Sequence, residues 1–230
     1  LAMPNNQKAI PLFDKLSPAA KLIGAVNTIV NDHGVLTGHI TNGTGFMQAL
    51  SNDGLDIRGD KMTLAGAGGA GTAIAIQAAL DGVREINIFN RRDASWQNAE
   101  RNVTIINDQT QGHATLFALD DQPALKASIS DSVIYVDATP AGMKPLETVS
   151  NVPDGDWFTS ETIVFDTVYA PRETKLMQLA KEAGVNHVYN GINMLINQGA
   201  AAFHLWTGLQ MPVDYIRETV FGEPAAVAHS

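Results

Sequence analysis

The chain contains no cysteine. Disulfide bonds, thiolate catalysis and cysteine-ligated metal sites are therefore excluded. None of the six histidines stands four residues from another or at a metal-like spacing from carboxylates, so a dedicated metal site is not expected. The sequence G-x-S-x-G is also missing, which removes the sequence argument for a serine hydrolase of that class.

Positive charge is scarce as well. The 15 lysines and arginines face 24 aspartates and glutamates, for a formal net charge of −9. Since nucleic acids and anionic membranes are polyanions, general binding to either is not expected. No apolar run approaches the roughly 18 residues of a membrane span, and we expect no signal peptide and a cytoplasmic location. The chain opens at Leu1 without a methionine, so we expect further residues upstream.

The most informative segment is a glycine-rich turn between a short apolar run and an apolar segment with helical spacing. Its residues are Gly66-Ala67-Gly68-Gly69-Ala70-Gly71. In a dinucleotide-binding unit the first glycine permits a sharp turn, the second lets the backbone approach the pyrophosphate, and the third lets helix and strand pack closely. The N–H groups at the start of the next helix then face the phosphates. The alternative is an ordinary glycine turn, because G-x-G-x-x-G is common by chance.

A second polar turn follows the next strand-like run, residues 85–89, and consists of Asn90, Arg91, Arg92 and Asp93. The run ends about 20 residues after the glycines, where a Rossmann unit reads the adenosine ribose. The two arginines can grip a 2′-phosphate, which favours NADP. Asp93 can instead accept hydrogen bonds from a free 2′-hydroxyl, which favours NAD. The choice between NADP and NAD stays open, and the alternative is a solvated charged turn.

Strand-like and helix-like segments alternate from residue 62 onward. Strands are predicted at 62–66, 85–89, 114–118, 133–137 and 163–167, with an edge strand at 185–189. This alternation predicts an α/β fold with a Rossmann-type, doubly wound parallel sheet. Upstream, residues 24–30 and 35–40 predict a hairpin, 43–53 a helix, and 14–22 a short helical turn containing a Ser-Pro break; 194–203 and 213–221 predict C-terminal helices.

Two other predicted strands end in polar motifs, Asp137-Ala-Thr139-Pro140-Ala-Gly142-Met143 and Asp166-Thr167-Val168-Tyr169. The carboxyl ends of parallel strands form the edge at which doubly wound folds bind ligands. Both motifs are therefore candidates for ligand contact, with simple turn chemistry as the alternative.

Seven motifs in chain order together resemble the shikimate/quinate dehydrogenase family. They are residues 16–20, 24–28, 66–71, 90–92, 137–143, 166–171 and 191–208. The resemblance implies a reversible hydride transfer between NAD(P) and a ring carbon of a shikimate- or quinate-like cyclic polyol carboxylate. It also implies the remainder of a substrate domain at 1–58, a Rossmann domain at 59–190, and C-terminal helices at 191–230 that return to the first domain. A homodimer is kept open.

The resemblance also assigns roles to residues. It implies that Asn27, Tyr169 and Gln198 contact the substrate. It implies that the cofactor is contacted by Gly66, Ala67, Gly68, Gly69, Ala70, Asn90, Arg91, Arg92, Asp93, Thr139, Thr167, Gly191 and Met194.

The chain departs from the family pattern at the catalytic pair. Where the family has Thr or Ser, an apolar residue, Pro, any residue and a catalytic Lys, this chain has Ala2-Met3-Pro4-Asn5-Asn6. The family's Asn-Thr-Asp-Gly, whose Asp pairs with that Lys, is here Ile40-Thr41-Asn42-Gly43. Asn6 and Asn42 thus stand where the Lys and Asp belong. The family's substrate-carboxylate-binding Ser-x-Ser segment lies in a part of the pattern upstream of Leu1.

These departures affect proton transfer. Asparagine cannot take a proton near neutral pH, and losing general acid–base help typically costs roughly 10²–10⁴ in rate. Lys8 is no obvious substitute for Asn6, because two residues further along a helix it points about 200° away. His39 can relay a proton, although an exposed hairpin histidine is the alternative. Three hypotheses remain: a dehydrogenase with an altered proton-transfer site, a non-catalytic dinucleotide-binding sensor or partner module, and another small-molecule reductase.

Overall fold

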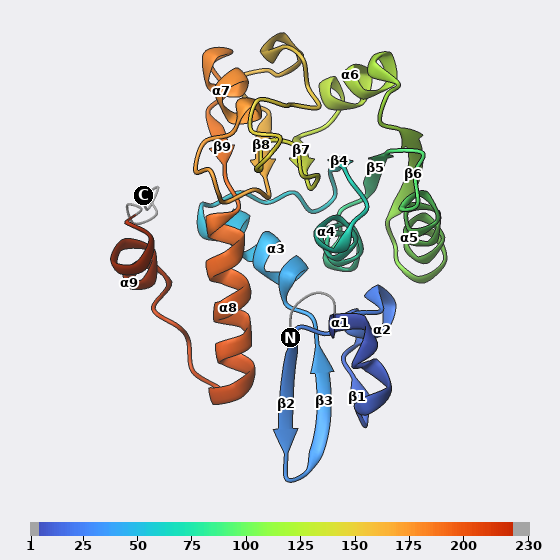
Figure 1. Cartoon of the computed structure of the whole chain (residues 1–230), viewed down its shortest axis with the longest axis vertical. Helices are drawn as coiled ribbons and strands as arrows, with labels where there is room; N and C mark the ends of the chain where they lie inside the picture. Colours follow the sequence, from blue (N-terminus) through green and yellow to red (C-terminus); the bar gives the residue numbers. More distant parts are fainter. Residues whose placement is uncertain (1–4, 223–230) are drawn as a thin grey trace. The chain divides into compact units, whose positions relative to one another are not determined.

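The structure, a computed structural model, describes residues 5–222 (Figure 1). The chain divides into two compact units. One consists of Leu1–Asp56 together with Asn193–Ser230, and the other of Ile57–Ile192. None of the helices in residues 5–222 combines the length and the apolar character that crossing a membrane requires.

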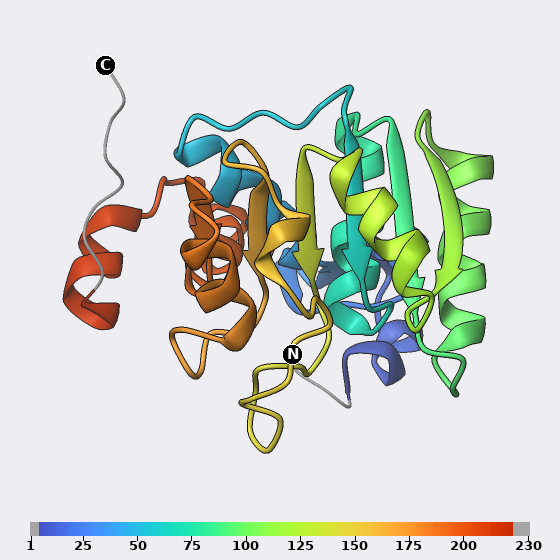
Figure 2. The same ribbon diagram turned by 90° about the horizontal axis from the view of Figure 1, so that it is seen from above.

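The unit formed by Ile57–Ile192 is built on a six-stranded sheet with the strand order β6-β5-β4-β7-β8-β9 (Figure 2). The strands are β4 (Lys61–Ala65), β5 (Glu85–Asn90), β6 (His113–Ala118), β7 (Ile134–Asp137), β8 (Ile163–Asp166) and β9 (His187–Tyr189). All their pairings are parallel. The predicted α/β fold with a doubly wound parallel sheet is confirmed, and each strand end lies within two residues of its predicted position.

Helices cover both faces of this sheet. Figure 1 shows α6 and α7 above the sheet and α4 and α5 below it. Their bounds are α4 (Gly69–Asp81), α5 (Trp96–Gln109), α6 (Gln122–Ser130) and α7 (Lys175–Glu182), with a short 3-10 turn, η2, at Gly155–Trp157. The helix α4 is apolar around most of its circumference, as expected of a helix buried between a sheet and a neighbouring helix.

The hydrophobic core between the sheet and helices α6 and α7 excludes solvent. Phe89, Leu125, Tyr135 and Val164 are completely shielded from solvent there. Burying each large apolar side chain stabilises the fold by about 1.5–3 kcal/mol. The packing of this core therefore fixes the positions of the carboxyl ends of β5, β7 and β8.

The other unit contains a three-stranded sheet in the order β1-β3-β2. Its elements are α1 (Asn5–Lys8), η1 (Ile10–Leu12), β1 (Lys15–Leu16), α2 (Pro18–Ile23), β2 (Thr28–Asp32), β3 (Val35–His39), α3 (Asn42–Asn52), α8 (Ile192–Thr207), α9 (Val213–Ile216) and a π-helical turn, η3, at Arg217–Phe221. Strands β2 and β3 pair antiparallel and form the predicted hairpin.

The prediction of a helical turn interrupted at Ser17-Pro18 was wrong. Residues 15–16 form a strand, and α2 begins directly after Ser17. The Ser17 hydroxyl accepts a hydrogen bond from Ala20 N at 3.2 Å and so caps the helix. Pro18 occupies the first helical position, where its missing N–H costs nothing. The Ser-Pro pair starts this helix and does not break one.

Candidate active site

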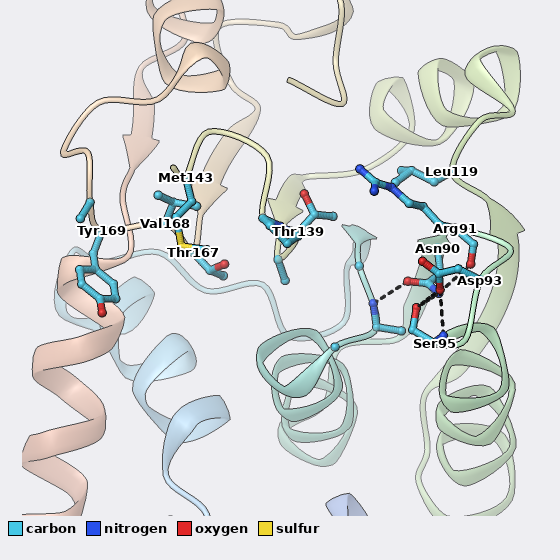
Figure 3. Close-up of a pocket in the computed structure, with 16 residues that line it drawn as sticks. Asn90, Arg91, Asp93, Ser95, Leu119, Thr139, Met143, Thr167, Val168 and Tyr169 are labelled. Atoms are coloured by element: carbon cyan, nitrogen blue, oxygen red, sulfur yellow. Dashed lines mark hydrogen bonds between the residues drawn. The ribbon is translucent and has the colours of Figure 1, made fainter. Parts of the chain in front are cut away.

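A cavity of about 590 Å³ opens at the carboxyl edge of the parallel sheet (Figure 3). It is bounded by the segments that follow β4, β5, β7 and β8 and by Leu119, which follows β6. The strand order reverses between β4 and β7, and doubly wound folds bind ligands at such a point. Of the predicted site residues, those that line the cavity are Gly66, Ala67, Gly68, Asn90, Arg91, Asp93, Thr139, Thr167 and Tyr169.

The three spaced glycines differ in what surrounds them. Gly66 has φ +95°, and a Cβ there would lie 2.8 Å from the Ala138 carbonyl oxygen. A Cβ on Gly71 would lie only 2.0 Å from the Gly66 carbonyl oxygen, so strand and helix meet without room for a side chain. A Cβ on Gly68 would meet nothing within 4 Å. Gly66 and Gly71 thus shape the turn, whereas Gly68 leaves its surface open to the cavity.

The start of α4 offers hydrogen-bond donors to this open surface. Gly68 is the N-cap residue of α4, and no side chain caps the helix there. The first N–H groups of an α-helix have no partner within the helix. Together with the positive end of the helix dipole, they suit an anion such as a pyrophosphate.

Asn90 braces the glycine turn. Its Oδ1 accepts a hydrogen bond from Ala67 N at 3.0 Å, and its Nδ2 donates to Ser95 Oγ at 2.8 Å. Figure 3 shows the first of these bonds joining the turn after β4 to the end of β5, and the second joining the end of β5 to the turn that follows it. Because both ends of the amide are engaged, Asn90 holds the cavity wall in shape.

Two asparagines of α5, which were not predicted from the sequence, form hydrogen bonds to the glycine turn and to the start of α4. Asn98 Nδ2 donates to the Ala67 carbonyl and, at 2.9 Å, to Thr72 Oγ1. Asn102 Nδ2 donates to the same Thr72 oxygen at 2.8 Å. A spacing of four residues places both amides on one face of α5, and that spacing was the available sequence signal.

The residues of the second polar turn diverge. Arg91 lines the cavity, whereas the guanidinium carbon of Arg92 lies 4.5 Å from the centroid of the Trp96 ring. Asp93 Oδ1 accepts hydrogen bonds from Ser95 Oγ at 2.6 Å and Ser95 N at 2.8 Å. These bonds lower the pKa of the Asp93 carboxyl, so it stays ionised at neutral pH. The turn therefore presents one cation and one anion to the cavity.

The remaining residues predicted to contact the cofactor lie outside the cavity lining. Gly69, Ala70, Arg92, Gly191 and Met194 are not among the cavity-lining residues. Gly191 packs behind Thr167, since a Cβ on it would lie 2.1 Å from the Thr167 carbonyl oxygen. Met194 belongs to the other unit.

One substrate-site candidate, Asn27, and one candidate at the catalytic pair, Asn42, meet in the unit of residues 1–56 and 193–230. Asn27 Nδ2 donates hydrogen bonds to Asn42 Oδ1 at 2.7 Å and to Thr41 Oγ1 at 3.0 Å. Asn27 Oδ1 accepts from Thr41 N at 3.1 Å. Asn42, the first residue of α3, is thus held by an uncharged amide network that joins the start of β2 to the start of α3.

Asn6 lies on α1 and is half-buried. Its carbonyl oxygen accepts a hydrogen bond from Val26 N at 2.9 Å. Its side-chain Oδ1 is buried without a hydrogen-bond partner among the described residues. Ala2, Met3 and Pro4, which precede it in the altered motif, lie outside the described residues.

Gln198 lies on α8, where that helix packs closely on α3. A Cβ on Gly45 of α3 would lie 2.6 Å from Gln198 N and 2.7 Å from the Met194 carbonyl oxygen. Asn52 Nδ2 also donates to Asn197 Oδ1 at 3.0 Å between the same helices. This close contact fixes Gln198 and α3 relative to each other.

His39 is half-buried on β3, so the alternative of an exposed hairpin histidine was wrong. Burial lowers the pKa of its imidazole, because the charged form loses solvation. At neutral pH the ring is therefore uncharged and able to accept a proton.

The six parallel strands, the glycine turn at the end of β4 and the cavity beside it define a Rossmann-type fold of the class that binds dinucleotides. Within this class, residues 191–221 match the family model described as the shikimate 5′-dehydrogenase C-terminal domain.

Whole-chain comparisons agree with that match. A shikimate dehydrogenase (NADP(+)) from Streptococcus uberis is 52% identical over 225 residues, which cover 97% of this chain and 76% of the relative. The crystal structure of shikimate 5-dehydrogenase from Listeria monocytogenes in complex with shikimate and NAD is 54% identical, with a TM-score of 0.93 over 96% of this chain and 76% of that chain. Quinate dehydrogenase from Corynebacterium glutamicum in complex with NAD is 30% identical, with a TM-score of 0.83 over 96% of this chain and 76% of that chain. The chain belongs to the shikimate dehydrogenase family, which confirms the resemblance of its motifs.

Proposed function

We propose that the protein is an NAD(P)-dependent oxidoreductase that interconverts an alcohol and a ketone on a shikimate- or quinate-like ring, with an altered proton-transfer site. The proposal rests mainly on the start of α4. Its N-cap residue, Gly68, lines the cavity, has open space where a Cβ would lie, and leaves the first N–H groups of the helix without a side-chain cap. Membership in the shikimate dehydrogenase family supplies the substrate class.

The cavity has the donors and shape that a dinucleotide needs. The amide groups after Gly68 would hold the pyrophosphate, and Arg91 and Asp93 would meet the adenosine ribose. Thr139 and Thr167 line the same cavity at the ends of β7 and β8, beside Tyr169. When bound, the nicotinamide supplies the hydride acceptor or donor; the protein binds it, orients it and excludes water.

The substrate would be held by Asn27, Tyr169 and Gln198, as the family resemblance implies. Oxidising its alcohol requires a proton to leave the hydroxyl as the hydride leaves carbon. Asn42 can donate and accept hydrogen bonds but cannot take that proton near neutral pH. The proposal therefore has three forms. Turnover of shikimate is slow, a related substrate is turned over faster, or uncharged His39 takes part in the proton transfer.

The amide network favours one alternative, a non-catalytic dinucleotide-binding sensor or partner module. Asn42 Oδ1 already accepts a hydrogen bond from Asn27, and neither group titrates near neutral pH. A site of this kind can bind a polyol through hydrogen bonds without promoting proton transfer. Cofactor binding would support both proposals, so turnover separates them.

The deciding experiment is steady-state oxidation of shikimate and of quinate by the full-length protein, with NAD and NADP separately, followed at 340 nm. Turnover at even about a thousandth of a typical 10 s⁻¹ would establish a working dehydrogenase. Binding of the cofactor and of shikimate or quinate without turnover would favour the sensor. Cofactor binding in a protein on which neither shikimate nor quinate has any effect would favour a reductase of another substrate.

Replacing Arg91 with alanine is expected to weaken NADP binding about 10- to 100-fold and NAD binding much less. A hydrogen bond to a charged group is worth about 1.5–3 kcal/mol, and only NADP has the 2′-phosphate to receive it. Arg92→Ala is the matched control, because stacking on Trp96 places that guanidinium outside the cavity lining. Titration of both cofactors with each variant measures the effect. Equal losses of NAD and NADP in Arg91→Ala would contradict a 2′-phosphate role.

A further inference from the structure

Two buried carboxyl groups lie at the ends of neighbouring strands, beside the loops that line the cavity. Asp137 ends β7 and Asp166 ends β8, and the two residues are direct partners across these parallel strands. They are 2% and 1% exposed, respectively. Neither carboxylate forms an ion pair with a described residue. Two like charges so placed, without a cation, strongly disfavour double ionisation.

Asp137 holds the first of two cavity-lining loops. Its Oδ1 accepts hydrogen bonds from Thr139 Oγ1 at 2.7 Å and Thr139 N at 2.9 Å. Its Oδ2 accepts from Asn151 Nδ2 at 2.9 Å and from the Tyr135 hydroxyl at 3.1 Å. Because the hydroxyl and the backbone N–H of Thr139 both donate hydrogen bonds to Asp137, this carboxylate sets the start of the loop 138–143.

Asp166 holds the second loop and connects it to the first. Its Oδ1 accepts a hydrogen bond from Val168 N at 2.9 Å, which sets the turn into residues 167–170. Its Oδ2 accepts from Thr174 Oγ1 at 2.6 Å. Thr174 in turn packs on the first loop, because a Cβ on Gly142 would lie 2.8 Å from Thr174 Cβ. The two loops are thus fastened to one carboxyl pair.

We propose that Asp137 and Asp166 are positioning residues that together carry one negative charge, with a proton on Asp166, and in that form hold both loops in the arrangement that receives the cofactor. This inference rests on the proposed binding of a dinucleotide in the cavity. It concerns residues that are themselves not among the cavity-lining residues.

The surroundings of Asp166 raise the pKa of its carboxyl group. Burial, followed by the nearby Asp137 charge, raises the pKa of Asp166 to about 7. Burial and the same carboxylates raise the pKa of Tyr135 well above its usual value, so its hydroxyl remains a donor to Asp137. On the α7 side, Thr174 is uncharged, and the charge of Glu173 is paired with Lys181 at 2.7 Å.

The ionisable residues that line the cavity are Arg91, Asp93 and Tyr169, and no histidine is among the described lining residues. Hydrogen bonds from Ser95 lower the pKa of Asp93. A change in cofactor affinity near pH 7 would therefore report on the carboxyl pair.

The direction of this change follows from linkage. A bound dinucleotide brings negative phosphates and displaces water above the pair, and both effects disfavour a second negative charge. The pKa of Asp166 is then higher in the complex than in the free protein. Binding takes up a proton above about pH 7, so affinity is constant below that pH and falls up to about tenfold per pH unit above it.

The test is the dissociation constant of NAD from about pH 6 to about pH 8.5, measured calorimetrically with wild-type protein and Asp166→Asn. NAD is the probe because it lacks the 2′-phosphate, a monoester whose second pKa lies near 6. The wild-type affinity is expected to fall about fivefold between about pH 7 and 8. Asp166→Asn mimics the protonated acid and is expected to keep the acid-side affinity throughout. The exposed Asp108→Asn is the matched control and should keep the wild-type profile.

Asp137→Asn provides a second variant in case Asp166→Asn does not fold. Without the neighbouring charge, the pKa of Asp166 falls, and the loss of affinity should begin at a lower pH. A flat wild-type profile with NAD bound would overturn the inference, as would an Asp166→Asn affinity reduced equally at every pH. Failure of the wild-type protein to bind NAD at any pH would instead contradict the proposed function itself.

Discussion

Replacing Gly68 with valine is expected to abolish binding of NAD and NADP while the protein stays folded. The backbone of Gly68 has φ −72° and ψ −167°, a region that a β-branched residue adopts readily. A Cβ would meet nothing within 4 Å, so the fold has room for the side chain. That room is the surface through which the pyrophosphate would reach the start of α4.

The expected loss of affinity is at least about 100-fold, because several hydrogen bonds to a charged group, worth about 1.5–3 kcal/mol each, are blocked together. Cofactor titration and thermal unfolding of Gly68→Val measure binding and folding separately. Gly71→Ala is the contrasting variant: its Cβ would lie 2.0 Å from the Gly66 carbonyl oxygen, so it should lower the stability. Retained cofactor affinity in a folded Gly68→Val protein would refute the assignment of the glycine turn.

The features that could be predicted from the sequence are those set by the local backbone. The strands were found because β4, β7 and β8 are short, largely buried apolar runs between turn residues, and the predicted ends were close. The glycine turn could also be predicted from the sequence, because the need for glycine at positions 66 and 71 arises from the local backbone. Ser17-Pro18 was misjudged because the same pair can end one helix or begin another.

What could not be predicted depends on side-chain direction and strand order. Arg91 and Arg92 are adjacent in the sequence, yet one lines the cavity and the other stacks on Trp96, the first residue of α5. Asp137 and Asp166 were recognised only as two separate strand ends. Their pairing follows from the adjacency of β7 and β8 in the sheet, which the sequence does not state.

Changing Asn6 to lysine together with Asn42 to aspartate is expected to raise the rate of shikimate oxidation by roughly 10²–10⁴, the usual contribution of general acid–base catalysis. The Asn42→Asp change suits the local structure, because Asn27 Nδ2 already donates to Oδ1 at this position and would donate more strongly to a carboxylate. Asn6 Oδ1 is buried without a partner among the described residues, so its replacement breaks no side-chain hydrogen bond there.

The rate is measured with saturating NADP and with NAD, at matched protein concentration, against each single variant. A matched control is Asn5→Lys with Asn42→Asp, which adds the same charges but places the lysine on an exposed neighbouring residue. Because lysine and carboxylate act as a unit, each single variant should recover little of the double variant's rate. A rise in the double variant alone would locate the defect in proton transfer and show that the rest of the pocket still accepts shikimate. An unchanged rate, with both cofactors still bound, would mean that the pocket has diverged beyond this pair and that the amide network serves a different ligand.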